Sequence, residues 1–231
     1  TSDKSIAVTG PSTKRAFELI DQGVPMEETG KSGVTNGAAM KILPVGMVND
    51  YRELDSLLEE VHRLCMPTHN TSVAVSGASA IAAAGSYALY GSGDLDEMME
   101  IACKAAEKGC AYGHEVPAPS VSERIKVALE YVKEYPEELA IQKIYDVIGT
   151  GLPIAESVPA ALGFVYLAKG DPYHCAVISA NAGGDTDTIG AMACGICGIL
   201  QGDSVFKEED IKLLESTNQL NFTSLTDKLF K

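Results

Sequence analysis

The chain has 231 residues, 45% of them hydrophobic and 22% charged, which suffices for one large core or two small ones. Its formal net charge of −14 argues against nucleic acid as a partner, because the phosphates would be repelled. The absence of Trp, the 6% of aromatic residues and the abundance of Ala and Gly favour closely packed helices over a β-sandwich.

The first half of the chain shows apolar residues at helical spacing, interrupted by Gly and Pro. After an irregular stretch over residues 1–10, a helix is predicted over residues 11–22 with Ser12 as N-cap, and then a loop over residues 24–35. Further helices are predicted over residues 38–48 with a kink at Pro44, 50–65, 68–90 and 94–109. Residues 73–90 are mostly Ala, Ser and Gly, too polar for a membrane span, so we expect a central packed helix and no membrane partner.

The second half continues the helical pattern. Helices are predicted over residues 120–135, 136–148, 160–168, 173–182, from Asp185 to about 202, 208–215 and 224–230. Residues 149–151 form a turn, and residues 152–159 fit no element. Strand signals are scarce and no linker divides the chain, so the prediction is a single compact all-α domain over residues 1–231.

Six cysteines lie mostly within apolar segments, and no secretory leader is recognisable. This pattern favours reduced thiols and a cytoplasmic location. Cys194 and Cys197 have zinc-knuckle spacing, but no second Cys or His pair matches them. We therefore interpret both as small apolar residues of a buried helix.

The most informative stretch follows the glycine pair Gly183-Gly184, which permits a tight turn before a helix. Asp185 alone would suit an N-cap, because the first helical turn favours negative charge. Asp185, Asp187 and Thr188 together carry more oxygen donors than capping needs, and hard donors suit Mg²⁺, Mn²⁺ or Ca²⁺. We favour a metal site over pure capping, although these side chains supply at most half of the about six oxygens that octahedral Mg²⁺ requires.

Four stretches in chain order resemble the ADP-ribosylglycohydrolase family, which includes the dinitrogenase-reductase-activating glycohydrolase and the J1 crystallins. They are residues 35–41 (TNGAAMK), 68–69 (TH), 149–151 (GTG) followed by 156–159 (ESVP), and 183–190 (GGDTDTIG). The resemblance implies an all-α fold with a two-metal Mg²⁺ or Mn²⁺ centre in a cleft. It also implies hydrolysis of the glycosidic bond between ADP-ribose and an acceptor, either a protein side chain or a related small molecule.

By position, the resemblance assigns metal binding to Asp185, Asp187 and Thr188, and a part in catalysis to the two aspartates. It assigns substrate binding, to the diphosphate and the neighbouring ribose, to Ser32, Gly33, Thr35, Asn36, Gly37 and His69. A loop that enters a helix aims backbone N–H groups at anions, and a histidine donates to phosphate oxygens. The alternatives are a turn that merely starts a helix and a histidine with a local hydrogen bond at a helix entrance.

Several features depart from the family pattern. Thr35 stands where the family usually has Gly, and Lys41 replaces a usual Arg, which keeps the charge but loses the bidentate fork. A Gly-Asp-x-x-Gly stretch, a Thr-Asp-Asp run of metal ligands and an upstream glutamate near the scissile bond are not found. We therefore expect a C-terminal portion of the family domain, with an N-terminal fragment completing the site.

Two other functions stay open. In the first alternative, the chain is a non-catalytic relative, which binds a nucleotide-like ligand weakly or serves a structural role as crystallins do. In the second, it belongs to a hydrolase of another riboside or nucleotide conjugate, because a fold and a metal site do not fix the acceptor.

Overall fold

The computed structural model describes residues 9–230, so most of the irregular stretch predicted over residues 1–10 lies outside the described residues. The described residues contain no β-strand, only two isolated bridges. Their thirteen α-helices are α2 (Pro11–Asp21), α3 (Met26–Thr29), α4 (Leu43–Val48), α5 (Leu54–His69), α6 (Ser72–Tyr90), α7 (Leu95–Gly109), α8 (Val121–Glu134), α9 (Glu137–Lys143), α10 (Ile154–Leu167), α11 (Pro172–Asn181), α12 (Thr186–Gln201), α13 (Glu208–Asn218) and α14 (Phe222–Leu229). Two 3-10 turns, η1 (Asn36–Ala38) and η3 (Asp203–Val205), and a π-helical turn, η2 (Ile144–Ile148), complete the set. The predicted fold class, a single compact all-α domain, is confirmed.

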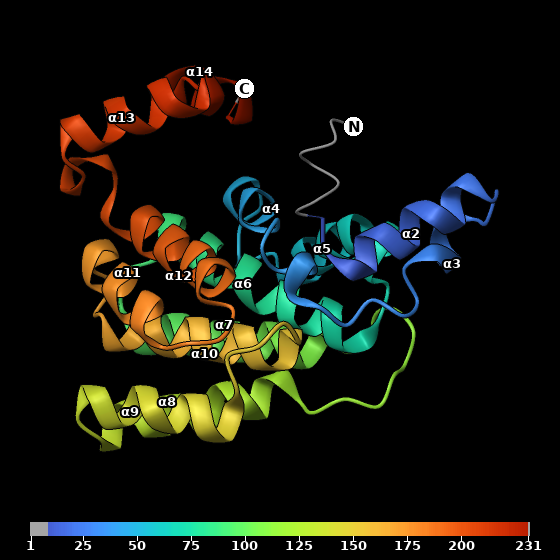
Figure 1. Ribbon diagram of the computed structural model, residues 1–231, viewed down its shortest axis with the longest axis horizontal. Helices are drawn as coiled ribbons and strands as arrows, with labels where there is room; N and C mark the ends of the chain where they lie inside the picture. The colour runs from blue at the N-terminus through green and yellow to red at the C-terminus, as the bar shows by residue number, and fades with distance from the viewer. Residues whose placement is uncertain (1–8, 231) are drawn as a thin grey trace.

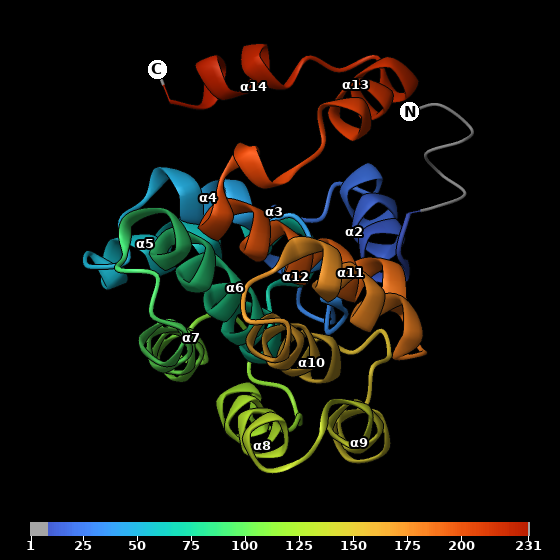
Figure 2. The same ribbon diagram turned by 90° about the vertical axis from the view of Figure 1, so that its left-hand side faces the viewer.

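Helix α6 lies at the centre, with α4, α5, α7, α10 and α12 packed around it (Figures 1 and 2). Every residue from Val73 to Tyr87 is buried, which the small side chains of this segment make possible. By length and composition α6 is the one helix of the described chain that is able to cross a membrane. Of its most apolar window, 83% is buried inside the protein, as in a core helix.

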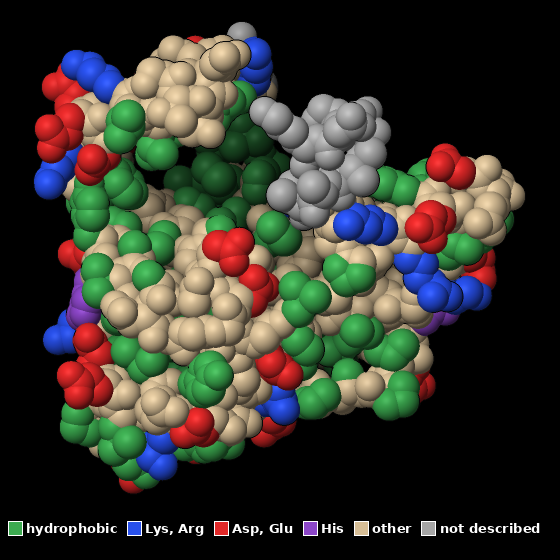
Figure 3. Space-filling view, in the orientation of Figure 1, with side chains coloured by type: hydrophobic (Ala, Val, Ile, Leu, Met, Phe, Trp, Pro, Cys, Tyr) green, Lys and Arg blue, Asp and Glu red, His purple; other side chains and the backbone are tan. Residues whose placement is uncertain are grey.

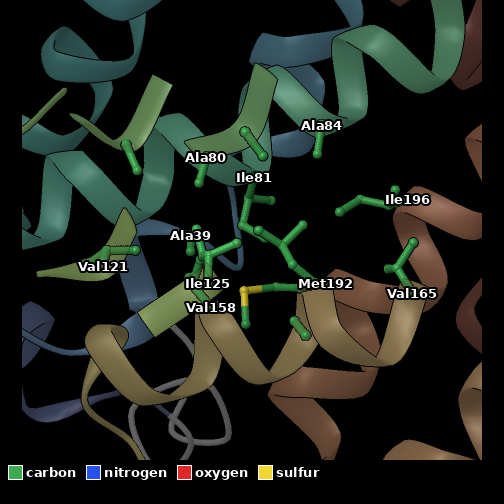
Figure 4. Packing of buried hydrophobic residues seen from close by; sticks show 14 of the residues in the cluster. Ala39, Ala80, Ile81, Ala84, Val121, Ile125, Val158, Val165, Met192 and Ile196 are labelled. Carbon is green, nitrogen blue, oxygen red and sulfur yellow. The ribbon is translucent and has the colours of Figure 1, made fainter. Parts of the chain in front are cut away.

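Helices α10 and α12 close the core against α6. In Figure 4 the buried side chains from the three helices meet, among them Ala80, Ile81 and Ala84 of α6, Val158 and Val165 of α10, and Met192 and Ile196 of α12. Because α12 is held along its length by this packing, its first turn has a fixed place relative to α6 and α10.

Prolines account for the main errors in the predicted boundaries. Helix α5 continues through Pro67 to His69, and α10 begins at Ile154 and continues through Pro159. A proline inside a helix removes the hydrogen bond to the carbonyl four residues earlier. For Pro159 that carbonyl belongs to Ala155, and Arg124 Nη1 of α8 donates to it at 3.1 Å. A tertiary contact thus replaces the missing bond, and the predicted helix over residues 160–168 is the second half of α10.

Two smaller differences lie at the N-terminal end. The N-cap of α2 is Gly10 rather than Ser12, whose hydroxyl instead lies 3.0 Å from Thr35 Oγ1. The predicted loop over residues 24–35 contains the short helix α3.

The last two helices form an arm that extends away from the rest of the molecule (Figures 1 and 2). None of their residues is buried, and Leu213 keeps 64% of its surface exposed. Figure 3 shows a hollow with hydrophobic side chains between this arm and the body. The helices predicted over residues 208–215 and 224–230 are thus present, but they do not contribute to the core.

Candidate metal and ligand site

The start of α12 is held by a close approach of two loops. The N–H of Asp185 donates to the Thr150 carbonyl at 2.7 Å. Gly184 has φ +76°, and a Cβ at this position would lie 2.3 Å from the same carbonyl oxygen. Only glycine satisfies both conditions, which explains the second residue of the glycine pair.

Asp185 occupies the N-cap position of α12, but its side chain makes no capping hydrogen bond. Its Oδ2 accepts from Asn36 Nδ2 at 2.5 Å, and its Oδ1 accepts from Thr188 Oγ1 at 3.1 Å. Simple capping therefore does not describe this carboxylate. Thr188 is buried, whereas Asp187 is exposed in the first turn of the helix.

Three segments that are distant in the sequence converge here. The N–H of Asn36 donates to the Leu152 carbonyl at 3.0 Å, and Thr35 and Pro153 form an antiparallel bridge. The turn whose Thr150 carbonyl accepts from the N–H of Asp185 therefore also positions the loop that contains Asn36. As a result, the structure brings the predicted Asn36 loop and the acidic entrance of α12 together.

His69 lies at the end of α5 rather than at the start of the next helix, and only 1% of its surface is exposed. Its Nε2 lies 3.0 Å from Thr35 Oγ1, and its Nδ1 lies 2.8 Å from Thr68 Oγ1. Burial, and secondarily the charge of Lys41, lowers its pKa to about 4, so the ring is neutral at neutral pH. The ring contacts the loop of residues 35–37 and helps to hold it in place. A contact between His69 and a phosphate stays a prediction.

The other predicted ligand-binding residues lie against the end of α5. A Cβ at Gly33 would lie 2.3 Å from the Thr68 carbonyl oxygen, and the Gly33 carbonyl accepts from Thr71 Oγ1 at 2.6 Å. Ser32 is exposed on the turn before it. A Cβ at Gly37 would lie 2.9 Å from the His69 ring, so the loop and the histidine are in direct contact.

Two further residues lie at the turn that supports this site. Thr150 is 2% exposed, and its hydroxyl has no hydrogen-bond partner among the described residues. Glu156 accepts from the N–H of Gly151 at 3.0 Å. Both stand in the stretches that resemble the family, but no role was assigned to either, because a single hydroxyl or a single carboxylate at a helix start does not predict a particular contact.

The donors at the α12 entrance are carboxylate and hydroxyl oxygens, the chemistry that Mg²⁺ and Mn²⁺ prefer. Within residues 9–230 no group of three or more His, Cys, Asp and Glu side chains is placed to hold a metal ion. The two aspartates with Thr188 therefore fit part of a divalent-cation site and do not complete one.

The fold and the site define an all-α protein with an oxygen-rich ligand site framed by glycines. The ADP-ribosylglycohydrolase family model matches residues 3–231. The uncharacterized protein YegU of Escherichia coli (strain K12) is 40% identical over 97% of this chain and 67% of its own length. An uncharacterized protein of Archaeoglobus fulgidus is 30% identical over 85% of this chain and 58% of its own length.

A third relative, ADP-ribosylhydrolase ARH3 of Xenopus tropicalis, is 26% identical over 75% of this chain and 54% of its own length. The chain belongs to the ADP-ribosylglycohydrolase family, as its sequence motifs indicated. It spans between about half and two thirds of the length of these relatives.

Proposed function

We propose that this chain supplies one part of the active site of a metal-dependent hydrolase. The reaction is cleavage of the glycosidic bond between ADP-ribose and an acceptor, on an ADP-ribosylated protein or a related small molecule. Membership of the family supports the reaction class. The observation that carries the proposal is the hydrogen bond between Asn36 and Asp185, which joins the ligand loop to the acidic helix entrance.

Asp185, Asp187 and Thr188 would hold the divalent cation, Mg²⁺ or Mn²⁺, of which the complete enzyme has two. Bound cations would orient the ribose hydroxyls and stabilise negative charge near the anomeric carbon. The chain's own contribution is positional. Asn36 and Thr188 donate to the two oxygens of Asp185 and so fix the direction of its carboxylate.

The loop of residues 32–37 would receive the diphosphate and the neighbouring ribose. It enters the 3-10 turn η1, where backbone N–H groups suit an anion. Neutral His69 keeps Thr35 in place, and Lys41 Nζ donates to Thr68 Oγ1 at 3.2 Å beside it. Lys41 thereby places a positive charge near this loop in a strongly acidic protein, which favours a negatively charged ligand there.

The metal ligands still required would come from a second segment, from water or from the substrate. We propose that an N-terminal fragment completes the site, and that the enzyme is cytoplasmic. The incomplete donor set also favours a second candidate, a non-catalytic relative that binds a nucleotide-like ligand or serves a structural role.

Calorimetric titration with Mg²⁺, Mn²⁺ and ADP-ribose tests the proposal. The isolated chain should bind Mn²⁺ weakly, and Asp185→Asn and Asp187→Asn should abolish that binding. Fusion to the unmatched part of the Escherichia coli relative should tighten it and produce hydrolysis of ADP-ribosylated protein. Metal binding without hydrolysis in the fusion would favour the non-catalytic relative, and tight binding by the isolated chain would contradict a partial site.

A further inference from the structure

The turn between η2 and α10, residues 149–153, is the point at which both parts of the candidate site are attached. Its Thr150 carbonyl accepts from the N–H of Asp185 at 2.7 Å, and its Leu152 carbonyl accepts from the N–H of Asn36 at 3.0 Å. A shift of this turn would therefore move the carboxylate and its amide partner together. Whatever holds the turn also sets the geometry of the site.

The side chain of Glu156 fills the inside of this turn. Its Oε2 accepts from the N–H of Gly151 at 3.0 Å. A Cβ at Gly149 would lie 2.5 Å from that oxygen, and a Cβ at Gly151 would lie 2.7 Å from it. The two glycines thus let the backbone fold closely around the carboxylate.

Arg124 of α8 holds the two ends of the same turn. Its Nη1 donates to the Ile148 carbonyl at 3.0 Å and to the Ala155 carbonyl at 3.1 Å. The second carbonyl lacks a helical partner because Pro159 has no N–H. Within the turn itself, the Glu156 side chain bonds to the middle of the backbone, at the N–H of Gly151.

We propose that Glu156 is a positioning residue, which acts through Gly151 and Thr150 to fix Asp185 and Asn36. The carboxylate does not touch the site itself. Its oxygen orders the turn, and the turn carbonyls then order the two backbone N–H groups. The effect on the backbone is independent of any ligand, whereas the effect on metal affinity rests on the proposed function.

The competing explanation is a carboxylate in the first turn of α10 that merely interacts with the helix dipole. Two conservative variants separate the explanations. Glu156→Gln keeps an oxygen that accepts from Gly151 but loses the charge. Glu156→Asp keeps the charge but withdraws the oxygen by one methylene. If Glu156 positions the turn, Glu156→Gln should behave like the wild type and Glu156→Asp should loosen the turn. If it only interacts with the helix dipole, Glu156→Asp should behave like the wild type and Glu156→Gln should not.

The decisive measurement is amide hydrogen exchange of the metal-free chain, resolved at Asp185 and Asn36. Glu156→Ala and Glu156→Asp should speed exchange at both amides by about tenfold, the factor that 1.4 kcal/mol of lost order corresponds to. Glu156→Gln should stay within about twofold of the wild type, and so should Glu130→Ala, an exposed carboxylate of α8 that serves as control. Exchange in the buried half of α10, residues 160–165, should not change.

Unchanged exchange at Asp185 in both Glu156→Ala and Glu156→Asp would overturn the proposal. So would equal acceleration along all of α10, which would indicate a general loss of the helix. If Glu156→Ala does not fold, the comparison of amide exchange in Glu156→Asp and Glu156→Gln decides between the two explanations.

Titration with Mn²⁺ extends the test to the site. Affinity should fall by about tenfold in Glu156→Asp and stay within about twofold in Glu156→Gln. If the wild-type chain binds no Mn²⁺, the proposed function fails while hydrogen exchange still decides the role of Glu156. If the wild type binds Mn²⁺ and both variants bind it equally well, the inference fails while the proposed function stands.

Discussion

Asp185 stands at the N-cap position of α12, yet both of its oxygens accept from side chains instead of from the first-turn amides. One of these donors, Asn36, is 2% exposed and lies 149 residues earlier in the chain. A hydrogen bond to a charged group contributes more to stability than one between neutral groups. The pair is therefore a structural link between two segments as well as part of a ligand site.

A double-mutant cycle of Asn36→Ala and Asp185→Ala measures this link. We expect a coupling free energy of about 1.5 kcal/mol from urea unfolding, as for hydrogen bonds to charged groups. The exposed pair of Lys212 and Glu208 on α13 is the control, and its coupling should stay below about 0.5 kcal/mol. Additive effects of Asn36→Ala and Asp185→Ala would show that the contact contributes nothing to stability.

The buried His69 makes stability depend on pH. Its pKa is lowered from 6.5 to about 4 in the folded protein, first by burial and then by the charge of Lys41. Above pH 6.5 the ring is neutral in both the folded and the unfolded state, and its contribution to stability is complete. As the pH falls toward 4, the unfolded state takes up the proton first, so the free energy of unfolding decreases.

Comparison with His69→Gln isolates this effect, because the carboxylates titrate equally in both proteins. Between about pH 7 and about pH 4 the wild type should lose about 3 kcal/mol more unfolding free energy than the variant. Parallel pH profiles of the wild type and His69→Gln would contradict the lowered pKa.

At the scale of elements, the entrance of α12 depends on two loops that touch through glycine. Gly184 needs both a left-handed conformation, φ +76°, and the room for the Thr150 carbonyl. Gly202, at the other end of α12, has the same φ of +76°, but a Cβ at this position would have no atom within 4 Å. The two positions therefore separate backbone strain from the close approach.

Gly202→Ala should cost only the backbone strain of an alanine at φ +76° and ψ −175°, about 1–3 kcal/mol. Gly184→Ala should cost that strain and a clash with the carbonyl as well, and should destabilise by at least about 2 kcal/mol more. It should also weaken Mn²⁺ binding, because the clash displaces the turn that holds Asp185. Chemical unfolding and Mn²⁺ titration of both variants test this prediction. Equal losses of unfolding free energy in the two variants would show that the loops separate without cost.

At the scale of the whole molecule, one core formed by α4 to α12 carries the stability, and the α13–α14 arm adds little. No residue of either arm helix is buried. One contact to the body is the hydrogen bond from Tyr173 Oη to Asp210 Oδ2, at 2.7 Å and exposed. The arm instead presents leucines and phenylalanines to its surroundings.

Deletion of residues 208–231 should therefore change the free energy of unfolding by less than about 1 kcal/mol, as surface changes do. Self-association should decrease with the loss of the exposed apolar side chains. Calorimetry and size-exclusion chromatography compare the two chains. A loss of several kcal/mol would mean that the arm packs against the body in solution.

Local rules predicted most helices, because apolar residues repeat at helical spacing in α5, α7 and α8 whatever their partners are. They failed at Pro67 and Pro159, where the helix continues through a residue that has no N–H. Pro159 is tolerated because Arg124 binds the free Ala155 carbonyl. No sequence pattern within α10 carries that information.

The oxygen-rich chemistry of Asp185, Asp187 and Thr188 and the family were determined by the sequence itself, since residue types and their spacing are local properties. Their roles as metal ligands stay predictions. Only the tertiary structure decided that Asn36 meets Asp185, that His69 is buried and neutral, and that Glu156 lies inside the turn between them. The first two depend on packing between segments far apart in the chain, and such contacts leave no periodicity in the sequence. The third joins residues only five apart, but a backbone that folds closely around one carboxylate has no repeating pattern that would predict it.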